Sequence, residues 1–215
     1  MELPCAPPRE HIKQPNIPTP PRACDTHFHL FGPAAKFPFS PERAYTPQDA
    51  PLEALLAMHA RLGVERGVIV QGNPHGTDNS ALLDALAREP GRLRAVAIVK
   101  DSVSDSELKR MADAGVRGVR FHHMPKGRGY SALGLKSFAA LAPRMAALGL
   151  HVQFMMDANF LDEALPYLES WTLPVVIDHM GNIDAALGVN QPGFQHMCRL
   201  LGEGRLWVKV SGGYR

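Results

Sequence analysis

Short β-rich runs alternate with amphipathic segments along most of the chain. The β-rich runs predict seven strands, at residues 23–29, 67–71, 94–99, 115–122, 151–156, 174–179 and 206–211. Between them, apolar residues mostly recur three and four positions apart, which predicts helices at residues 52–62, 79–88, 105–114, 135–148, 161–169 and 193–201. Such an alternation is typical of parallel strands joined by crossover helices.

Two α/β architectures fit this alternation, an open doubly wound sheet and a (β/α)8 barrel. A nucleotide-binding doubly wound sheet usually has a glycine-rich phosphate loop after its first strand, and no such loop follows residue 29. Polar and ionisable residues instead follow nearly every predicted strand, where a barrel collects its active site. We therefore predict a (β/α)8 TIM barrel that is truncated after the seventh strand.

Length and proline content predict the domain organisation. The 215 residues favour one domain, because chains usually divide only beyond about 250 residues. Residues 1–22 contain seven prolines, which favour extended backbone, so we expect a proline-rich leader before a barrel domain at residues 23–215.

The composition excludes several classes of protein. Hydrophobic residues make up 45% of the chain and charged residues 20%, which fits neither a disordered nor a fibrous protein. The net charge of +2 is too small to predict a nucleic-acid or anionic-membrane surface. Three widely spaced cysteines form no disulfide framework, and no apolar run is long enough to span a bilayer. We therefore expect a cytoplasmic protein with no nucleic-acid or membrane partner.

The first predicted strand carries the clearest candidate chemistry. Asp25, His27 and His29 alternate along it, so the two-residue period of a strand predicts that all three share one face. Two histidines that point together can hold a metal ion or handle protons, because their nitrogens converge on one atom.

The sixth and fourth strands add further candidates. His179 follows the apolar run 175–177, and we expect it in the same layer as His29, although a lone histidine of this kind is often a hydrogen-bonded core residue. Arg120 and His122 share a face at the end of the fourth strand. A cationic loop follows, in which Lys126 and Arg128 suit an anionic substrate about as well as they suit a solvated surface.

The second strand leads into a turn-rich segment. Asn73 and His75 are candidate substrate contacts there, whereas Thr77 and Asp78 more naturally cap the following helix. On the seventh strand, Lys209 and Ser211 are further polar candidates, but a lysine at a strand end is usually structural, and we include neither in the predicted site.

Several motifs in order resemble a known family. They are the runs Asp-Thr-His-Phe-His at 25–29, Phe-Pro-Phe-Ser at 37–40 with Tyr45, His-Gly-Thr-Asp-Asn at 75–79, Arg-Phe at 120–121 and Val-Ile-Asp-His-Met-Gly at 176–181. From about residue 18 to its end, the chain is similar to the amidohydrolase-related TIM-barrel hydrolases. Within that family it resembles the lactonase subgroup that includes 2-pyrone-4,6-dicarboxylate hydrolase.

The resemblance implies hydrolysis of the lactone ester of a small carboxylated ring in aromatic-compound degradation. It implies that His27, His29 and His179 polarise the lactone carbonyl, either as hydrogen-bond donors or through a divalent metal such as Zn or Mn. It also implies that Arg120 binds a substrate carboxylate. The expected partner is a small anionic lactone or dicarboxylate, and the protein is a candidate homo-oligomer.

The resemblance also implies an eighth strand that ends in a general-base aspartate. The chain stops at Arg215, after the seventh predicted strand, so it has no counterpart of that aspartate. We therefore expect it to be part of a longer gene product, and a chain ending here to lack normal turnover. Two alternatives stay open, a metal-dependent decarboxylase or lactone isomerase on the same barrel, and a truncated, non-catalytic carboxylate-binding fragment.

Overall fold

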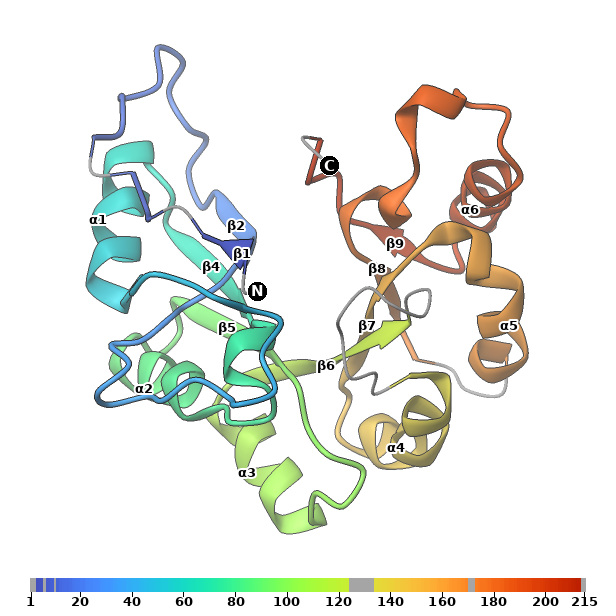
Figure 1. Ribbon diagram of the computed structural model, residues 1–215, viewed down its shortest axis with the longest axis horizontal. Helices are drawn as coiled ribbons and strands as arrows, with labels where there is room; N and C mark the ends of the chain where they lie inside the picture. The colour runs from blue at the N-terminus through green and yellow to red at the C-terminus, as the bar shows by residue number, and fades with distance from the viewer. Residues whose placement is uncertain (1–2, 6, 10, 124–133, 170–172, 214–215) are drawn as a thin grey trace. The chain divides into compact units, whose positions relative to one another are not determined.

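The computed structural model describes residues 3–5, 7–9, 11–123, 134–169 and 173–213 (Figure 1). The strands are β1 (Leu3–Pro4), β2 (Cys24–Phe28), β3 (Tyr45–Thr46), β4 (Arg66–Val70), β5 (Leu93–Ala97), β6 (Val116–His123), β7 (His151–Met156), β8 (Val175–Ile177) and β9 (Trp207–Val208). The α-helices are α1 (Leu52–Leu62), α2 (Ser80–Arg88), α3 (Asp105–Ala114), α4 (Leu135–Ala147), α5 (Leu161–Glu169) and α6 (Pro192–Gly202). Each predicted strand and helix is found, with bounds shifted by a few residues.

The strand order separates the two candidate architectures. Seven strands form one sheet in the order β2-β4-β5-β6-β7-β8-β9, and the pairs β2/β4, β4/β5, β6/β7, β7/β8 and β8/β9 are parallel. Strands in a (β/α)8 barrel follow chain order in this way, whereas a doubly wound sheet reverses its order at a switch point. The predicted barrel-type fold with seven strands is therefore confirmed.

The chain divides into two compact units, which are described separately. Unit 1 comprises residues 1–99 and 108–116, and unit 2 comprises residues 100–107 and 117–215. In unit 1, helices α1 and α2 lie on one side of β2, β4 and β5 (Figure 1). In unit 2, helices α4, α5 and α6 lie on one side of β7, β8 and β9.

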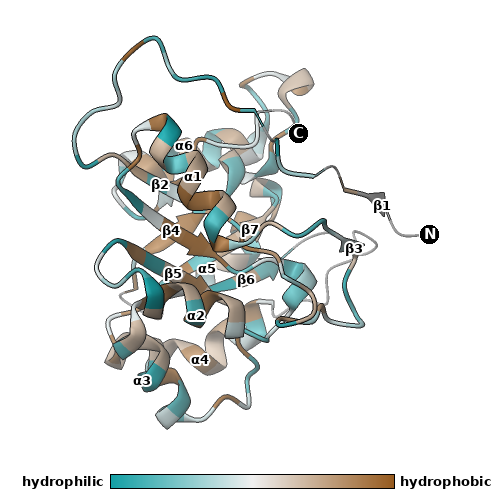
Figure 2. Cartoon of the chain, turned by 90° about the vertical axis from the view of Figure 1, so that its left-hand side faces the viewer, coloured by the Kyte–Doolittle hydropathy of each residue, from teal (hydrophilic) through white to brown (hydrophobic). Residues whose placement is uncertain are grey.

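Each unit has its own apolar core between strands and helices. In unit 1, Ile69 of β4 and Leu93 of β5 are buried with Leu82 of α2, and Figure 2 shows these strands as strongly hydrophobic. In unit 2, the rings of Phe121, Phe138 and Phe154 contact one another with centroids 5.5–5.8 Å apart. Burial of these side chains supplies most of the stabilisation, because each large apolar side chain contributes about 1.5–3 kcal/mol.

One local feature differs from the sequence prediction and one agrees with it. Part of the leader is regular, because Leu3 and Pro4 pair in parallel with Tyr45 and Thr46. A proline is tolerated in such an edge strand because its nitrogen need not donate. At the start of α2, Asp78 accepts a hydrogen bond from Ser80 N at 2.9 Å, which agrees with its predicted capping role.

Within the part of the chain that the structure describes, none of the helices is both long and apolar enough to span a membrane.

Candidate functional site

Unit 2 is organised around the carboxylate of Asp178, which follows β8 and is fully buried. Arg120 on β6 donates to its Oδ2 through Nε at 3.0 Å and Nη2 at 2.9 Å. Gln153 on β7 donates to its Oδ1 through Nε2 at 2.8 Å. A buried ion pair of this kind is stable only when its remaining polar atoms also form hydrogen bonds. Gln153 supplies one such hydrogen bond, to Asp178 Oδ1.

Lys209 extends this network from β9. Its Nζ donates to Gln153 Oε1 at 2.9 Å and lies 3.9 Å from Asp178 Oδ1. Lys209, which we interpreted as structural from its place at a strand end, belongs to this network, as do Gln153 and Asp178, which were not predicted. An amide inside the apolar run of β7 and an aspartate directly before His179 are the sequence signals that could have indicated them.

His122 lies two residues beyond Arg120 on β6 and is also buried. Burial, and after it the charge of Arg120, lower the pKa of His122, whereas Asp178 raises it, and the net pKa is about 3. His122 is therefore a neutral imidazole at physiological pH, able to exchange hydrogen bonds but carrying no charge for an anion.

We expect protein stability to fall as the pH is lowered from about 6.5 towards about 3, and His122→Gln to make this fall shallower. Above pH 6.5 the ring is neutral in the folded and unfolded chain. Below it, only the unfolded chain takes up the proton, which favours unfolding by about 1.4 kcal/mol per pH unit. Burial also lowers the pKa of His75 and His151, so these two residues also make the folded protein less stable as the pH falls. Urea unfolding midpoints between pH 7 and pH 4 measure the slope.

The matched control is His11→Gln, because His11 is exposed. An unchanged slope in His122→Gln, equal to that of this control, would contradict the assignment of His122 as a buried neutral ring.

His179 occupies an unusual backbone conformation directly after Asp178. The turn His179–Asn182 has four successive positive φ angles, at 52°, 53°, 68° and 49°, and only the third belongs to a glycine. Met180 N donates to Lys209 O at 3.0 Å and Asn182 Nδ2 donates to Met156 O at 2.8 Å, which hold the turn in place. Strained backbone of this kind costs about 1–3 kcal/mol per residue and is concentrated at functional sites.

The ring of His179 is oriented by the hydroxyl group of Ser211, which lies beyond the end of β9. Its Nδ1 lies 2.9 Å from Ser211 Oγ, and the side chain is largely buried. This contact directs Nε2 away from Ser211, so Nε2 is the atom that we assign to chemistry. Ser211 was not included in the predicted site, and in the structure its hydroxyl contacts the ring of His179.

In unit 1, a bulge changes the predicted face of Asp25. The pairing of β2 with β4 shifts between Asp25 and Phe28, so the alternation of side chains is interrupted. Asp25 Oδ2 lies 3.2 Å from His59 Nε2 on α1, and the ring of Phe28 contacts the same histidine. The prediction that Asp25 shares a face with His27 and His29 is therefore wrong, because the extra residue of the bulge turns its carboxylate towards α1.

The carboxylate of Asp25 instead supports the bulge. Its Oδ1 accepts a hydrogen bond from His27 N at 3.1 Å. Burial raises the pKa of Asp25. The hydrogen bonds from His59 and from the His27 backbone, with the charges of both rings, together lower it by more, so the net pKa lies below its usual value.

His27 and His29 remain neighbours, as predicted. Their ring centroids lie 5.2 Å apart at an angle of 82°. His29 Nδ1 lies 2.7 Å from Val70 O and therefore carries the proton, which leaves the lone pair on Nε2. Metal-binding histidines commonly donate their second nitrogen to a carbonyl in this way.

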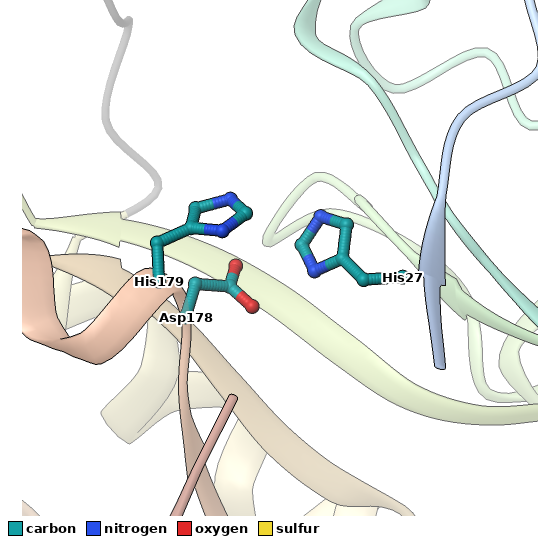
Figure 3. Close-up of side chains that lie close together, drawn as sticks. All are labelled: His27, Asp178 and His179. Atoms are coloured by element: carbon teal, nitrogen blue, oxygen red, sulfur yellow. The ribbon is translucent and has the colours of Figure 1, made fainter. Parts of the chain in front are cut away.

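Each unit carries side chains of a kind that can bind a divalent metal. Ligand-type atoms are carried by His27 in unit 1 and by Asp178 and His179 in unit 2 (Figure 3). Imidazole nitrogens suit Zn, and imidazole with carboxylate suits Mn.

The other predicted contacts of unit 1 have visible local roles. His75 is buried, with its Nδ1 3.3 Å from Pro38 O and its Nε2 3.4 Å from Gly32 N. Asn73 Oδ1 accepts from Ala44 N at 3.2 Å. These bonds shape the segments after β2 and β4, and substrate binding by either residue stays a prediction. Lys126 and Arg128 lie outside the described residues.

The structure thus assigns the predicted residues to two groups. Unit 1 holds His27, His29, Asn73 and His75, and unit 2 holds Arg120, His122 and His179. Parallel strands in chain order with imidazoles and a buried ion pair at their carboxyl ends define the class of (β/α)-barrel enzymes.

The chain belongs to the amidohydrolase family, whose profile matches residues 24–215. It is 37% identical over 98% of its length to 4-sulfomuconolactone hydrolase of Hydrogenophaga intermedia, and 40% identical over 92% to 2-pyrone-4,6-dicarboxylate hydrolase of Comamonas testosteroni. The crystal structure of a candidate 2-pyrone-4,6-dicarboxylic acid hydrolase from Pseudomonas putida is 38% identical, with a TM-score of 0.79 over 90% of this chain and 70% of that chain. The predicted resemblance to amidohydrolase-related barrel hydrolases is confirmed. The chain spans 69% and 65% of the lengths of the two curated relatives.

Proposed function

We propose that the complete gene product hydrolyses the lactone ester of a small ring bearing carboxylates, of the 2-pyrone-4,6-dicarboxylate type. The observation that carries this proposal is the arrangement after β8, where His179 is held in a strained turn with Nδ1 on Ser211, directly after the buried Asp178–Arg120 pair. Family membership and relatives named as lactone hydrolases support the same reaction.

In the proposed reaction, water adds to the lactone carbonyl and the ester C–O bond breaks, which leaves a hydroxyl group and a carboxylic acid. The acid then ionises to a carboxylate and releases one proton to solvent. We assign His27, His29 and His179 to the carbonyl oxygen, where N–H donation by each ring stabilises the negative charge that develops. His29 donates from Nε2 in its doubly protonated form, because its Nδ1–H is held by Val70 O. When a divalent metal such as Zn or Mn is bound, the same three imidazoles would hold it, and it would supply Lewis-acid polarisation of that carbonyl.

We assign Arg120 to a substrate carboxylate, with His122, Asn73, His75, Lys126 and Arg128 as further contacts. Because Arg120 is 4% exposed and held by Asp178, a carboxylate would meet a guanidinium of fixed orientation. A preoriented donor loses little entropy on binding, which favours recognition of a rigid anion. His122 contributes hydrogen bonding without charge. A cytoplasmic location and a homo-oligomeric state stay predictions.

The proposal is tested with the complete gene product and two substrates, 2-pyrone-4,6-dicarboxylate and the uncharged parent 2-pyrone. We expect ring opening of the dicarboxylate with kcat/KM at least about tenfold higher, because each charge-assisted hydrogen bond contributes about 1.5–3 kcal/mol. Loss of pyrone absorbance and titration of the released acid measure the reaction. Release of carbon dioxide would indicate a decarboxylase instead, and failure to open either ring would overturn the proposal. Loss of activity on chelation, restored by Zn or Mn, would establish the metal-bound form.

A further inference from the structure

We propose that Phe31 forms a flat platform beside His29 that selects planar, conjugated rings over saturated, puckered ones. This inference rests on the proposed function, because it names the class of ring that the site would take.

The platform belongs to an aromatic cluster within unit 1. The ring of Phe31 lies 5.7 Å from that of His29, centroid to centroid, at an angle of 39°. On its other sides it stacks on His75 at 6.2 Å and 26°, and contacts Tyr45 at 6.4 Å and Phe39 at 6.5 Å. Phe28, which directly precedes His29, is buried, whereas Phe31 is only half-buried and therefore lies partly at the surface of unit 1.

Backbone contacts fix the position of Phe31. Its N and O form a reciprocal pair with Ala50, at 3.1 Å to Ala50 O and 2.7 Å from Ala50 N. The ring also packs closely on the backbone of Gly72, where an added Cβ would lie 2.7 Å from Phe31 Cε1. Glycine at residue 72 therefore permits this ring position, because any larger residue would displace the ring.

A fixed aromatic face favours one shape of ligand. An offset-stacked pair of flat rings contributes beyond the area that it buries, since the electron-rich face of one ring meets the positive edge of the other. A saturated ring presents axial hydrogens or hydroxyl groups and cannot stack in this way. Because Phe31 lies beside His29, which we assign to the lactone carbonyl, a stacked conjugated lactone would also be oriented for that contact.

The test uses two dianions that cannot be hydrolysed and differ in ring shape. Isophthalate is flat, whereas cis-cyclohexane-1,3-dicarboxylate is puckered and carries its carboxylates at the same ring positions. Calorimetric titration of the complete gene product should show tighter binding of isophthalate. In Phe31→Leu, we expect isophthalate to bind about three- to tenfold more weakly and the cyclohexane ligand to change little.

Three further variants separate stacking from a general loss of structure. Phe31→Tyr retains the ring face and should retain the preference. Gly72→Ala leaves Phe31 in the chain but displaces its ring, so it should lose the preference. Trp207→Leu, which removes a 70% exposed ring at the first residue of β9, should change neither affinity. Thermal melts of each variant confirm that it is folded.

The outcomes distinguish this inference from the proposed function. Equal weakening of both ligands in Phe31→Leu, or an unsubstituted protein that binds isophthalate no more tightly than the cyclohexane ligand, would overturn the platform. A preference that depends on Phe31 in a protein that opens no lactone would support the platform and overturn the proposed reaction.

Discussion

Asp178→Asn is expected to lower the free energy of unfolding by about 3–5 kcal/mol. Asparagine has almost the same shape as aspartate, so the loss reflects charge rather than volume. The variant leaves Arg120, whose side chain is 5% exposed, without its carboxylate, and removes the negative charge nearest Lys209. Taking such cations out of water costs several kcal/mol when no opposite charge compensates them. Urea unfolding at pH 7 measures the difference.

Two comparisons make this expectation specific to the buried network. Asp162→Asn removes a carboxylate that is 81% exposed and pairs with His196, and we expect a change below about 1 kcal/mol. Asp178→Asn combined with Arg120→Met should recover part of the loss, because the uncompensated guanidinium is gone. If Asp178→Asn unfolds no more easily than Asp162→Asn, the buried network does not have the role assigned to it.

His179→Ala is expected to lower kcat/KM for lactone opening by about 10²- to 10³-fold, mainly through kcat, when the complete gene product is assayed. We assign the imidazole to the carbonyl oxygen, where it stabilises the developing negative charge. This charge is larger in the transition state than in the bound substrate, so the interaction accelerates the chemical step. Binding of isophthalate, which has no reacting carbonyl, should therefore change little. Steady-state kinetics and calorimetric titration give the two measurements.

The strained backbone of His179 calls for a second variant. Asparagine tolerates the left-handed conformation at φ 52°, whereas alanine does not, so His179→Asn separates loss of the imidazole from loss of the turn. Both variants should lose turnover. His196→Ala removes another largely buried histidine, on α6, and should leave turnover within about twofold. Normal turnover in His179→Asn would remove His179 from the proposed chemistry.

The fold was largely predictable because its information is local. Parallel strands and amphipathic helices carry their periods in adjacent residues, so the alternation and the number of strands could be inferred from the apolar pattern. The bulge between Asp25 and Phe28 could not, because it depends on how β2 pairs with β4 and on His59, a residue that lies 34 positions away. A single extra residue then reversed the predicted face of Asp25.

The sequence predicted the residue types of the site but only part of the hydrogen bonds and ion pairs that join them. His27 and His29 at the end of β2, Arg120 near the end of β6 and His179 after β8 stand out because they are ionisable residues in or beside apolar strands. The partners that orient them are separated by up to 58 residues, as Arg120 is from Asp178, and by 32 between His179 and Ser211. Hydrogen bonds of this kind depend on register and side-chain direction across neighbouring strands, which leave no periodic signal along the chain.

The sequence by itself therefore determined the alternating α/β architecture, the family and the residue types at the strand ends, because these follow from local periodicity and from ordered motifs. Only the tertiary structure decided which carboxylate neutralises Arg120, that Lys209 and Gln153 belong to the same buried network, and that Asp25 turns towards α1. Desolvation is the physical reason, because a buried charge is stable only beside compensating partners. The residues that lie close enough to be partners are determined by the tertiary structure and not by their separation along the sequence.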